Sequence, residues 1–305
     1  MEALVNRLRA LAERTITDCT FTKRATYLGR EEDTPVLLPS GDEKYLSFWV
    51  RDAAMMAESG LLPDGDLRRS LEIIALCGQN GAEERHLKHG LRVPPFAVAD
   101  HINYDGRPVF FPGTYESGED QGGGKYGYLP PFCDNYFFVL LAAQYIRQSG
   151  DLAILGREYG GMTLTERLCR AADGYGIDEE SDLCVSDAEA YTVDWGFVDT
   201  VKKTGKLLMA SLLRHNAHRA LGRMLSAIGD DRCKQYLTKS EKIAGSVRDT
   251  FYDGTTGWLF SATGIGHQHD VWATAYAVFS GVISNRKALA ALAVAYRDRT
   301  AVADG

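Results

Sequence analysis

The chain has 305 residues, 45% hydrophobic and 25% charged, which is typical of a globular protein with a sizeable core. Its formal net charge of −7, without a dense Lys/Arg run, argues against a nucleic-acid partner. No signal peptide and no membrane span are predicted, because no N-terminal apolar core and no stretch of about 18 apolar residues occur. The six cysteines are scattered without a C-x-x-C pair, so we expect reduced thiols in a cytoplasmic protein.

Apolar residues recur at helical intervals along most of the chain. A stripe at i, i+4, i+7 and i+8 predicts a first helix over residues 2–14. Residues 17–47 hold Gly, Pro and short apolar runs, which predict irregular chain or a short hairpin. Two more helices are expected, one over residues 52–60 and one over residues 66–78 with Asp66 as its N-cap.

Residues 84–131 break this rhythm with Gly, Pro and aromatic residues. Asp105-Gly106 lies between apolar flanks and predicts a hairpin turn. Long segments of this kind are usually functional or disordered, and the aromatic content favours the wall of a site. Further helices are predicted over residues 134–149, 163–174, 206–225, 232–252, 271–283 and 287–296. The chain therefore contains nine or ten predicted helices, and without a Gly/Ser-rich linker we expect one domain over residues 1–305.

Three short stretches place an Asp within three residues of a Trp, each at the mouth of a predicted helix. They are residues 48–52 (FWVRD), 191–200 (YTVDWGFVDT) and 267–272 (HQHDVW). A sugar ring offers hydroxyls to carboxylates and an apolar C–H face to an indole, and glycosidic cleavage needs a proton-donating acid opposite a base or nucleophile. An architecture that gathers helix ends at one rim would bring the three stretches together as a sugar site.

Taken together, these stretches resemble the six-hairpin glycosidases, the (α/α)6-barrel enzymes that include glucoamylases, trehalases and alpha-L-rhamnosidases. Residues 48–52 are similar to the Trp-x-Arg-Asp segment of glucoamylase-like barrels, which implies that Arg51 and Asp52 hold hydroxyls of the terminal sugar. Residues 268–272, with the apolar helix that follows them, resemble a segment that recurs in the later hairpins of the superfamily.

The stretch with Asp194, Trp195 and Asp199 resembles the Asp-Trp loop of alpha-L-rhamnosidases, in which the Asp binds sugar and a carboxylate just downstream is the general acid. The acid should be the carboxyl that is desolvated, because burial raises its pKa and keeps it protonated near neutral pH. Asp199 matches the family position, whereas Asp194 lies nearer the indole, and we favour Asp199. The alternative is that both acids cap helices or lie solvated in a loop.

The resemblance implies an all-α (α/α)6 toroid, and the turn signal at Asp105-Gly106 adds a small β-hairpin in residues 84–131. Such a barrel needs twelve helices and nine or ten are predicted, so we expect a toroid that is incomplete at its C-terminus, as a truncated barrel or an incomplete gene. The general base of the family commonly lies late in the barrel. Only Asp298 and Asp304 follow Asp270 among the late carboxylates, so the base is Asp270, an earlier residue such as Asp52, or absent.

We therefore predict a glycoside hydrolase that removes a terminal sugar from an oligosaccharide or glycoside by acid/base catalysis with carboxylates, and the resemblance implies inversion. The catalytic candidates are Asp199 and Asp194. The candidate substrate-binding residues are Trp49, Arg51, Asp52, Trp195, His269, Asp270 and Trp272. No cofactor is expected. His267, His269 and Asp270 have the chemistry of zinc ligands but lack a distant partner cluster, so no metal is predicted.

Ordinary structural roles and two other functions remain open. Arg51 and Asp52 have the pattern of a structural pair at a helix start, and Trp272 that of a core residue of its helix. A sugar epimerase of the helical-toroid type would use histidines for proton transfer, with His267, His269 and His101 as candidates. A degenerate barrel that kept its tryptophans but lost its base would bind carbohydrate without catalysis.

Overall fold

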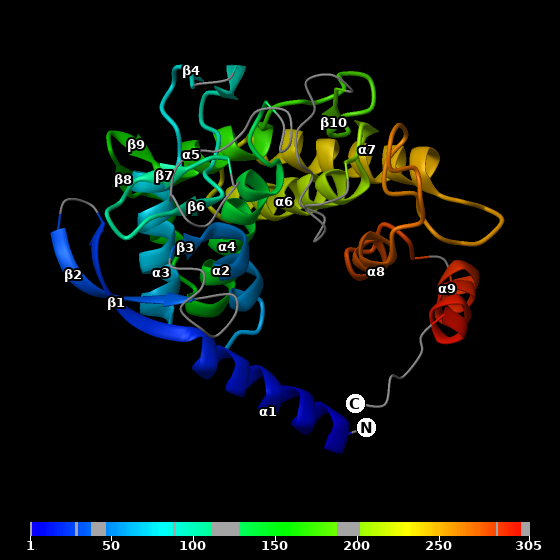
Figure 1. Cartoon of the computed structure of the whole chain (residues 1–305), viewed down its shortest axis with the longest axis horizontal. Helices are drawn as coiled ribbons and strands as arrows, with labels where there is room; N and C mark the ends of the chain where they lie inside the picture. The colour runs from blue at the N-terminus through cyan, green and yellow to red at the C-terminus, as the bar shows by residue number, and fades with distance from the viewer. Residues whose placement is uncertain are drawn as a thin grey trace.

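The computed structural model describes residues 2–27, 30–37, 47–87, 90–111, 128–187, 202–284 and 286–299, and it is predominantly helical (Figure 1). The described part of the chain holds nine α-helices, which confirms the all-α prediction. They are α1 (Glu2–Cys19), α2 (Val50–Ala57), α3 (Asp64–Ile73), α4 (Cys133–Ser149), α5 (Leu164–Asp173), α6 (Leu208–Ala227), α7 (Cys233–Phe251), α8 (Val271–Phe279) and α9 (Arg286–Arg299). None of these helices is long and apolar enough to cross a membrane.

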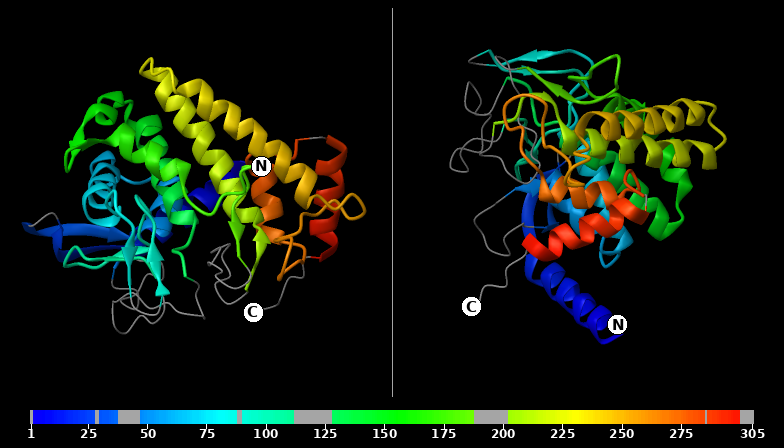
Figure 2. Two further views of the ribbon diagram at one scale, coloured as in Figure 1. Left: turned by 90° about the horizontal axis from the view of Figure 1, so that it is seen from above. Right: turned by 90° about the vertical axis from the view of Figure 1, so that its right-hand side faces the viewer.

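Helices α2, α4, α6 and α8 form a row, in which α2 packs against α4, α4 against α6 and α6 against α8. The intervening helices α3, α5 and α7 pack against neighbouring members of this row. Alternation of inner and outer helices is the arrangement of an α/α toroid. Within the described residues α2 and α8 do not pack together, so the row is open rather than closed into a ring (Figure 2).

The main apolar core lies between the inner row and the outer helices, and α6 contributes most to it. Most of the 20 residues of α6 are buried, including Leu212 and Leu221. Each fully buried leucine stabilises the fold by about 1.5–3 kcal/mol relative to an exposed one. Gly222 allows the close approach of α7, because a β-carbon there would lie 2.7 Å from Cγ of Leu237.

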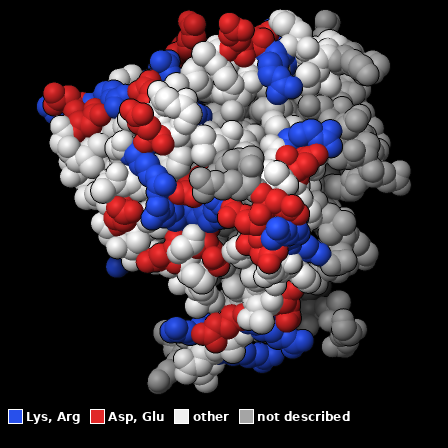
Figure 3. Space-filling model, turned by 90° about the vertical axis from the view of Figure 1, so that its left-hand side faces the viewer, with Lys and Arg blue, Asp and Glu red and all other residues white. Residues whose placement is uncertain are grey.

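The N-terminal segment differs in length from its prediction. Helix α1 continues to Cys19 rather than ending at residue 14, and the ion pairs Arg9–Glu13 and Arg14–Asp18 support its polar face at i, i+4 spacing. The following segment is a hairpin of two eight-residue strands, β1 (Thr20–Tyr27) and β2 (Arg30–Leu37). On the face drawn in Figure 3, basic and acidic side chains are interspersed.

The other strands are short, and they connect the helices. They are β3 (Phe48–Trp49), β4 (Arg85–His86), β5 (Arg92–Val93), β6 (His101–Ile102), β7 (Pro108–Val109), β8 (Glu158–Tyr159), β9 (Met162–Thr163), β10 (Val185–Ser186) and β11 (Gly205–Lys206). The predicted turn at Asp105-Gly106 is confirmed: it joins β6 to β7, and Gly106 has the positive φ of 82° that such a turn requires. Strand β3 pairs with β6, so the order of this sheet is β3-β6-β7.

Two local details of the helices depend on short-range chemistry. The η1 segment (Ile74–Gly78) extends α3 with a π-helical turn, and η3 (Leu152–Gly156) is a 3-10 turn after α4. The prediction that Asp66 is an N-cap is wrong, because α3 begins at Asp64 after Pro63, and Asp66 lies in its first turn. Proline suits this boundary since its fixed φ is compatible with a helix start.

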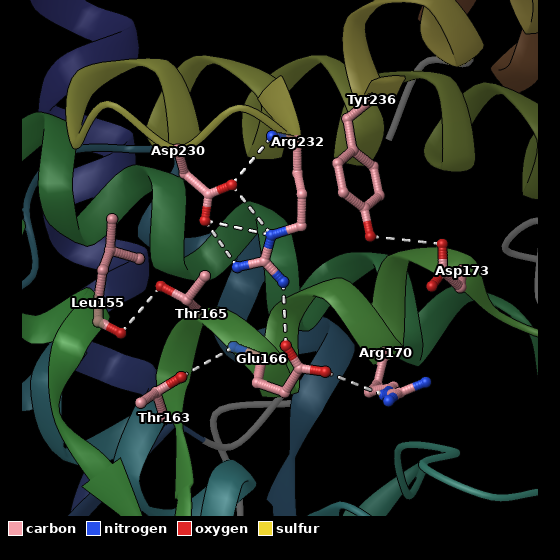
Figure 4. A network of polar contacts seen from close by, with 9 residues as sticks. All are labelled: Leu155, Thr163, Thr165, Glu166, Arg170, Asp173, Asp230, Arg232 and Tyr236. Atoms are coloured by element: carbon pink, nitrogen blue, oxygen red, sulfur yellow. Dashed lines mark hydrogen bonds and ion pairs between the residues drawn. The ribbon is translucent and has the colours of Figure 1, made fainter. Parts of the chain in front are cut away.

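A polar network ties α5 to the start of α7 (Figure 4). The hydroxyl of Thr163 caps α5 by accepting a hydrogen bond from the Glu166 amide at 3.2 Å. Arg232 forms ion pairs with Asp230 at 2.7 Å and with Glu166 at 3.0 Å. Because these side chains are partly exposed, the network contributes modestly to stability and mainly fixes the orientation of the two helices.

The starts of the inner helices follow one another along one side of the molecule, where the short strands also gather (Figure 2). Contacts link each start to the next one. They are Arg51 Nη1 to Cys133 Sγ, Tyr136 Oη to Cys184 Sγ, the Leu207 amide to the Cys184 carbonyl, and the Leu208 amide to the Ser261 carbonyl. Residues 48–52 begin α2 and residues 267–272 begin α8, so these two stretches lie at opposite ends of the row.

Candidate functional site

Strand pairing places a polar segment beside the start of α2. Trp49 of β3 lies opposite His101 of β6, and the Val50 amide donates to the Asp100 carbonyl at 3.2 Å. Trp49 is extended and provides no side-chain cap, so the main chain of residue 100 satisfies the first amide of α2. The side chain of Asp100 therefore lies next to the first turn of α2, which carries Arg51 and Asp52.

Three carboxyl groups and a thiol gather around Arg51, and we call these five residues the acidic cluster. The Arg51 guanidinium lies 3.8 Å from Asp100 Oδ1 and 3.9 Å from Asp52 Oδ2. Its Nη1 atom donates to Cys133 Sγ at 3.9 Å, and this thiol lies 3.7 Å from Asp134 Oδ2. Cys133 and Asp134 occupy the first turn of α4, so the cluster is built where α2, α4 and the β3-β6-β7 sheet meet.

Two members of the acidic cluster carry unsatisfied oxygen atoms. Asp134 is 0% exposed and Asp100 is 1% exposed, and Oδ1 of each accepts no hydrogen bond from the described residues. A buried polar atom without a partner costs about 1–3 kcal/mol. Native structures keep few such atoms, and those that persist at the mouth of helices are candidates to accept hydrogen bonds from a ligand.

Burial and neighbouring charges shift the pKa values of three residues of the acidic cluster. It raises the pKa of Asp134 well above its ordinary value, and the nearby charge of Asp100 raises that pKa further. Burial also raises the pKa of Asp52, against the opposing effect of Arg51. Burial by itself lowers the pKa of Arg51, but Cys133, Asp100 and Asp134 outweigh this and raise it. The cluster thus combines a cation with two carboxyl groups whose pKa values are raised, which is the direction that general acid catalysis requires.

His101 lies against this cluster. Its Nδ1 atom is 2.8 Å from Asp100 Oδ2, and its ring packs at a tilt against Trp49 with a centroid distance of 4.3 Å. Trp49 is only 5% exposed, so His101 and its other neighbours cover most of the indole surface that was predicted to contact a sugar. Arg51 and Asp52, with side chains 15% and 22% exposed, form the accessible part of the site.

The stretch at the start of α8 is organised around a helix cap. Asp270 Oδ1 accepts a hydrogen bond from the Ala273 amide at 2.8 Å, and its Oδ2 lies 4.0 Å from Lys203 Nζ. His269 Nε2 lies 2.9 Å from Asp253 Oδ2. Trp272 is 65% exposed, so it is not a core residue of its helix. These contacts account for Asp270 and His269 structurally.

The histidines predicted for epimerase chemistry are divided between two places. His267 and His269 both stack on the Phe260 ring, with centroid distances of 4.0 Å and 4.9 Å. His101 instead belongs to the sheet beside α2. Among the residues that the structure describes, no group of three or more His, Cys, Asp or Glu side chains could hold a metal ion.

Some predicted site residues lie outside the described part of the chain, and two residues of the acidic cluster were not predicted. Asp194, Trp195 and Asp199 lie outside the described residues. Sequence reasoning missed Asp100 and Asp134 as site residues. Each is a charged residue within an apolar run, AVADHI for the first and FCDNYFF for the second, and this pattern is a usable signal because Asp is seldom fully buried without a partner.

Comparisons with known proteins establish the fold. No family profile matches the chain, and no curated protein does. A rhamnosidase from Klebsiella oxytoca with rhamnose bound is 13% identical, with a TM-score of 0.54 over 83% of this chain and 42% of its own. A GH78 family rhamnosidase of Bacillus sp. GL1 is 15% identical, with a TM-score of 0.61 over 97% of this chain and 26% of its own. A UGL variant with dGlcA-Glc-Rha-Glc is 10% identical, with a TM-score of 0.53 over 94% of this chain and 70% of its own.

The chain therefore spans less than half the length of either rhamnosidase. These likenesses confirm the predicted (α/α)6-toroid fold class, in a form whose inner row is open within the described residues.

Proposed function

We propose that this protein is a glycoside hydrolase that removes a terminal sugar from an oligosaccharide or glycoside. The acidic cluster carries this proposal, because glycosidic cleavage needs a carboxyl group that retains its proton and a second group that activates water or attacks carbon. The likeness to a rhamnosidase with rhamnose bound and to UGL with an oligosaccharide supports a carbohydrate substrate.

The accessible residues of the cluster bind the sugar in this proposal. Arg51 donates to hydroxyl oxygens, and Asp52 accepts from hydroxyl hydrogens of the terminal ring. Asp199 protonates the leaving oxygen, with Asp194 as the alternative donor in the same stretch. Asp52 is a third candidate for the donor, because burial raises its pKa while 22% of its side chain is exposed. Trp272, His269 and Asp270 contact more distant parts of the substrate.

Hydrolysis of aryl glycosides tests the proposal and identifies the donor. The panel contains rhamnosides, glucosides, mannosides and glucuronides, and the variants are Asp199→Asn, Asp194→Asn and Asp52→Asn. Loss of the general acid should lower kcat by about 100-fold or more for a poor leaving group. The same variant should keep most of its activity on a dinitrophenyl glycoside, whose leaving oxygen needs little protonation. Asp231→Asn, a change of an exposed acid, is the matched control.

The stereochemical outcome is part of the same test. We propose inversion, and proton NMR of the first-formed sugar distinguishes it from retention. Absence of turnover across the panel, together with sugar binding by calorimetry, would reject the hydrolase and favour a carbohydrate-binding protein. Neither binding nor turnover with any sugar would reject both.

A further inference from the structure

His101 is fixed by two contacts that leave one of its nitrogen atoms unengaged. The ring packs against Trp49 with a centroid distance of 4.3 Å and an interplanar angle of 31°, and Nδ1 lies 2.8 Å from Asp100 Oδ2. Nε2 has no hydrogen-bond partner among the described residues. The Nε2 atoms of His215 and His218 are also without a hydrogen-bond partner, but they are buried, whereas Nε2 of His101 is not among the buried unsatisfied atoms.

The partner of Nδ1 decides which nitrogen carries the proton. Asp100 is 1% exposed, and its other oxygen lies 3.8 Å from the Arg51 guanidinium, so a cation lies against this carboxylate. An ionised carboxylate only accepts hydrogen bonds, so Nδ1–H of His101 donates to Oδ2. In the neutral imidazole Nε2 then bears a lone pair and no proton, and the hydrogen bond of Nδ1 orients the ring.

We propose that His101 is the general base of the hydrolase and that Asp100 is its positioning residue. This inference rests on the proposed function. Nε2 takes a proton from water as the water oxygen bonds to the anomeric carbon, the glycosidic C–O bond breaks, and the acid donates its proton to the leaving oxygen. The products are the free sugar, the released alcohol and a protonated His101, which returns its proton to solvent while the acid is reprotonated.

This assignment fills the role that the sequence left open between Asp270, Asp52 and no residue at all. Asp270 has one oxygen engaged as the cap of α8 and the other near Lys203, and it lies at the far end of the inner row. Asp52 has a raised pKa and lies beside Arg51, so it is better suited to hold sugar hydroxyls or to donate a proton than to accept one.

The tautomer of His101 provides a test that needs no substrate. Long-range proton–nitrogen NMR correlations distinguish Nδ1–H from Nε2–H imidazoles, and a His101→Gln variant assigns the signal among the seven histidines. We expect Nδ1–H in the intact protein and a change toward Nε2–H in Asp100→Asn, whose amide can donate to Nδ1. An Nε2–H tautomer in the intact protein would overturn the inference, whatever the activity of the enzyme.

Kinetics supply the second test. His101→Ala should lower kcat by about 100-fold or more on both poor and dinitrophenyl leaving groups, because water activation is needed for each. Added imidazole should restore part of the activity, because His101→Ala removes a ring of the same size from the space beside Trp49. His86→Ala, which removes a histidine side chain that is 73% exposed, is the control and should keep full activity.

The outcomes separate the two proposals. Hydrolysis that survives in His101→Ala, or a loss confined to poor leaving groups, would show that the enzyme is a hydrolase with a different base. A folded His101→Ala variant that is inactive and gains nothing from imidazole would also count against the base role. Absence of hydrolysis in the intact protein rejects the proposed function, and the tautomer then still reports whether the Asp100–His101 pair is built as inferred.

Discussion

The protein should lose stability below about pH 6.5 because His218 is buried in its neutral form. This residue of α6 is 0% exposed, and its Nδ1–H donates to the Arg214 carbonyl at 3.0 Å. Its Nε2 atom is buried without a partner. Burial lowers the pKa of His218 well below 6.5, and the positive charge of Arg214 lowers it further. The Tyr236 ring packs at a tilt against His218, with a centroid distance of 5.4 Å, and offers no negative charge to offset this.

The sign follows from the unfolded chain, in which this histidine has its ordinary pKa near 6.5. Above that pH neither state binds the proton and stability is complete. As the pH falls below 6.5, the unfolded state binds a proton that the folded state does not bind, and the free energy of unfolding decreases. Below pH 6.5, each pH unit lowers the free energy of unfolding by about 1.4 kcal/mol until the folded protein is protonated. Only one of the two units between pH 7.5 and 5.5 lies below 6.5, so this change costs about 1.4 kcal/mol.

Urea unfolding at pH 7.5 and 5.5 measures this effect. His218→Gln keeps a donor for the Arg214 carbonyl but does not titrate, so it should lose about 1.4 kcal/mol less than the wild type over this range. His215, whose pKa burial also lowers, adds a similar slope to both proteins. The exposed-site variant His86→Gln should behave as the wild type does. If the free energies of unfolding of wild type and His218→Gln differed by the same amount at both pH values, the reasoning would be refuted.

Three further predictions concern helix packing and capping. Gly222→Ala should destabilise the protein by about 1–3 kcal/mol in urea unfolding because its β-carbon would lie 2.7 Å from the Leu237 side chain. Gly245→Ala on α7 meets only a side-chain nitrogen at 3.9 Å and should instead stabilise by up to about 1 kcal/mol, so equal effects would contradict this account. Thr163→Ala removes the cap of α5 and should cost about 1 kcal/mol, an effect that Thr163→Ser should largely avoid. Arg232→Ala should cost at most about 1 kcal/mol and lose this effect in 1 M salt, whereas a salt-independent loss would point to packing instead.

Periodicity predicted the helices well where one face is buried and the other is solvated. Helices α4, α6 and α7 lie within two residues of their predicted ends, because their apolar stripes are long and regular. Helix α8 was predicted to reach residue 283 but ends at Phe279, since Gly281 adopts a positive φ of 79° and its amide bonds back to Val278. The apolar residues beyond this turn continue the pattern without continuing the helix.

The acidic cluster shows what sequence alone could and could not predict. Arg51 and Asp52 were identified because they are adjacent and follow a tryptophan. Asp100 and Asp134 were not, because their roles depend on strand pairing and helix packing between distant segments. The Arg51–Cys133 contact, for example, joins residues 82 positions apart. No local pattern reports such a contact, although a charge within an apolar run indicates that something must compensate for its burial.

The open row of inner helices also gives the molecule a direction in which it loosens. Among the inner helices, each packs on its predecessor and successor in the row, so the row behaves as a short one-dimensional array with nearest-neighbour coupling. Local unfolding of α8 breaks its contacts with α6 and leaves the packing of α2 against α4 intact. Hydrogen exchange should therefore proceed inward from the α8 end, with the amides around Arg51 and Asp134 among the last to open. The geometry of the acidic cluster is thereby insulated from fluctuations at the opposite end of the array.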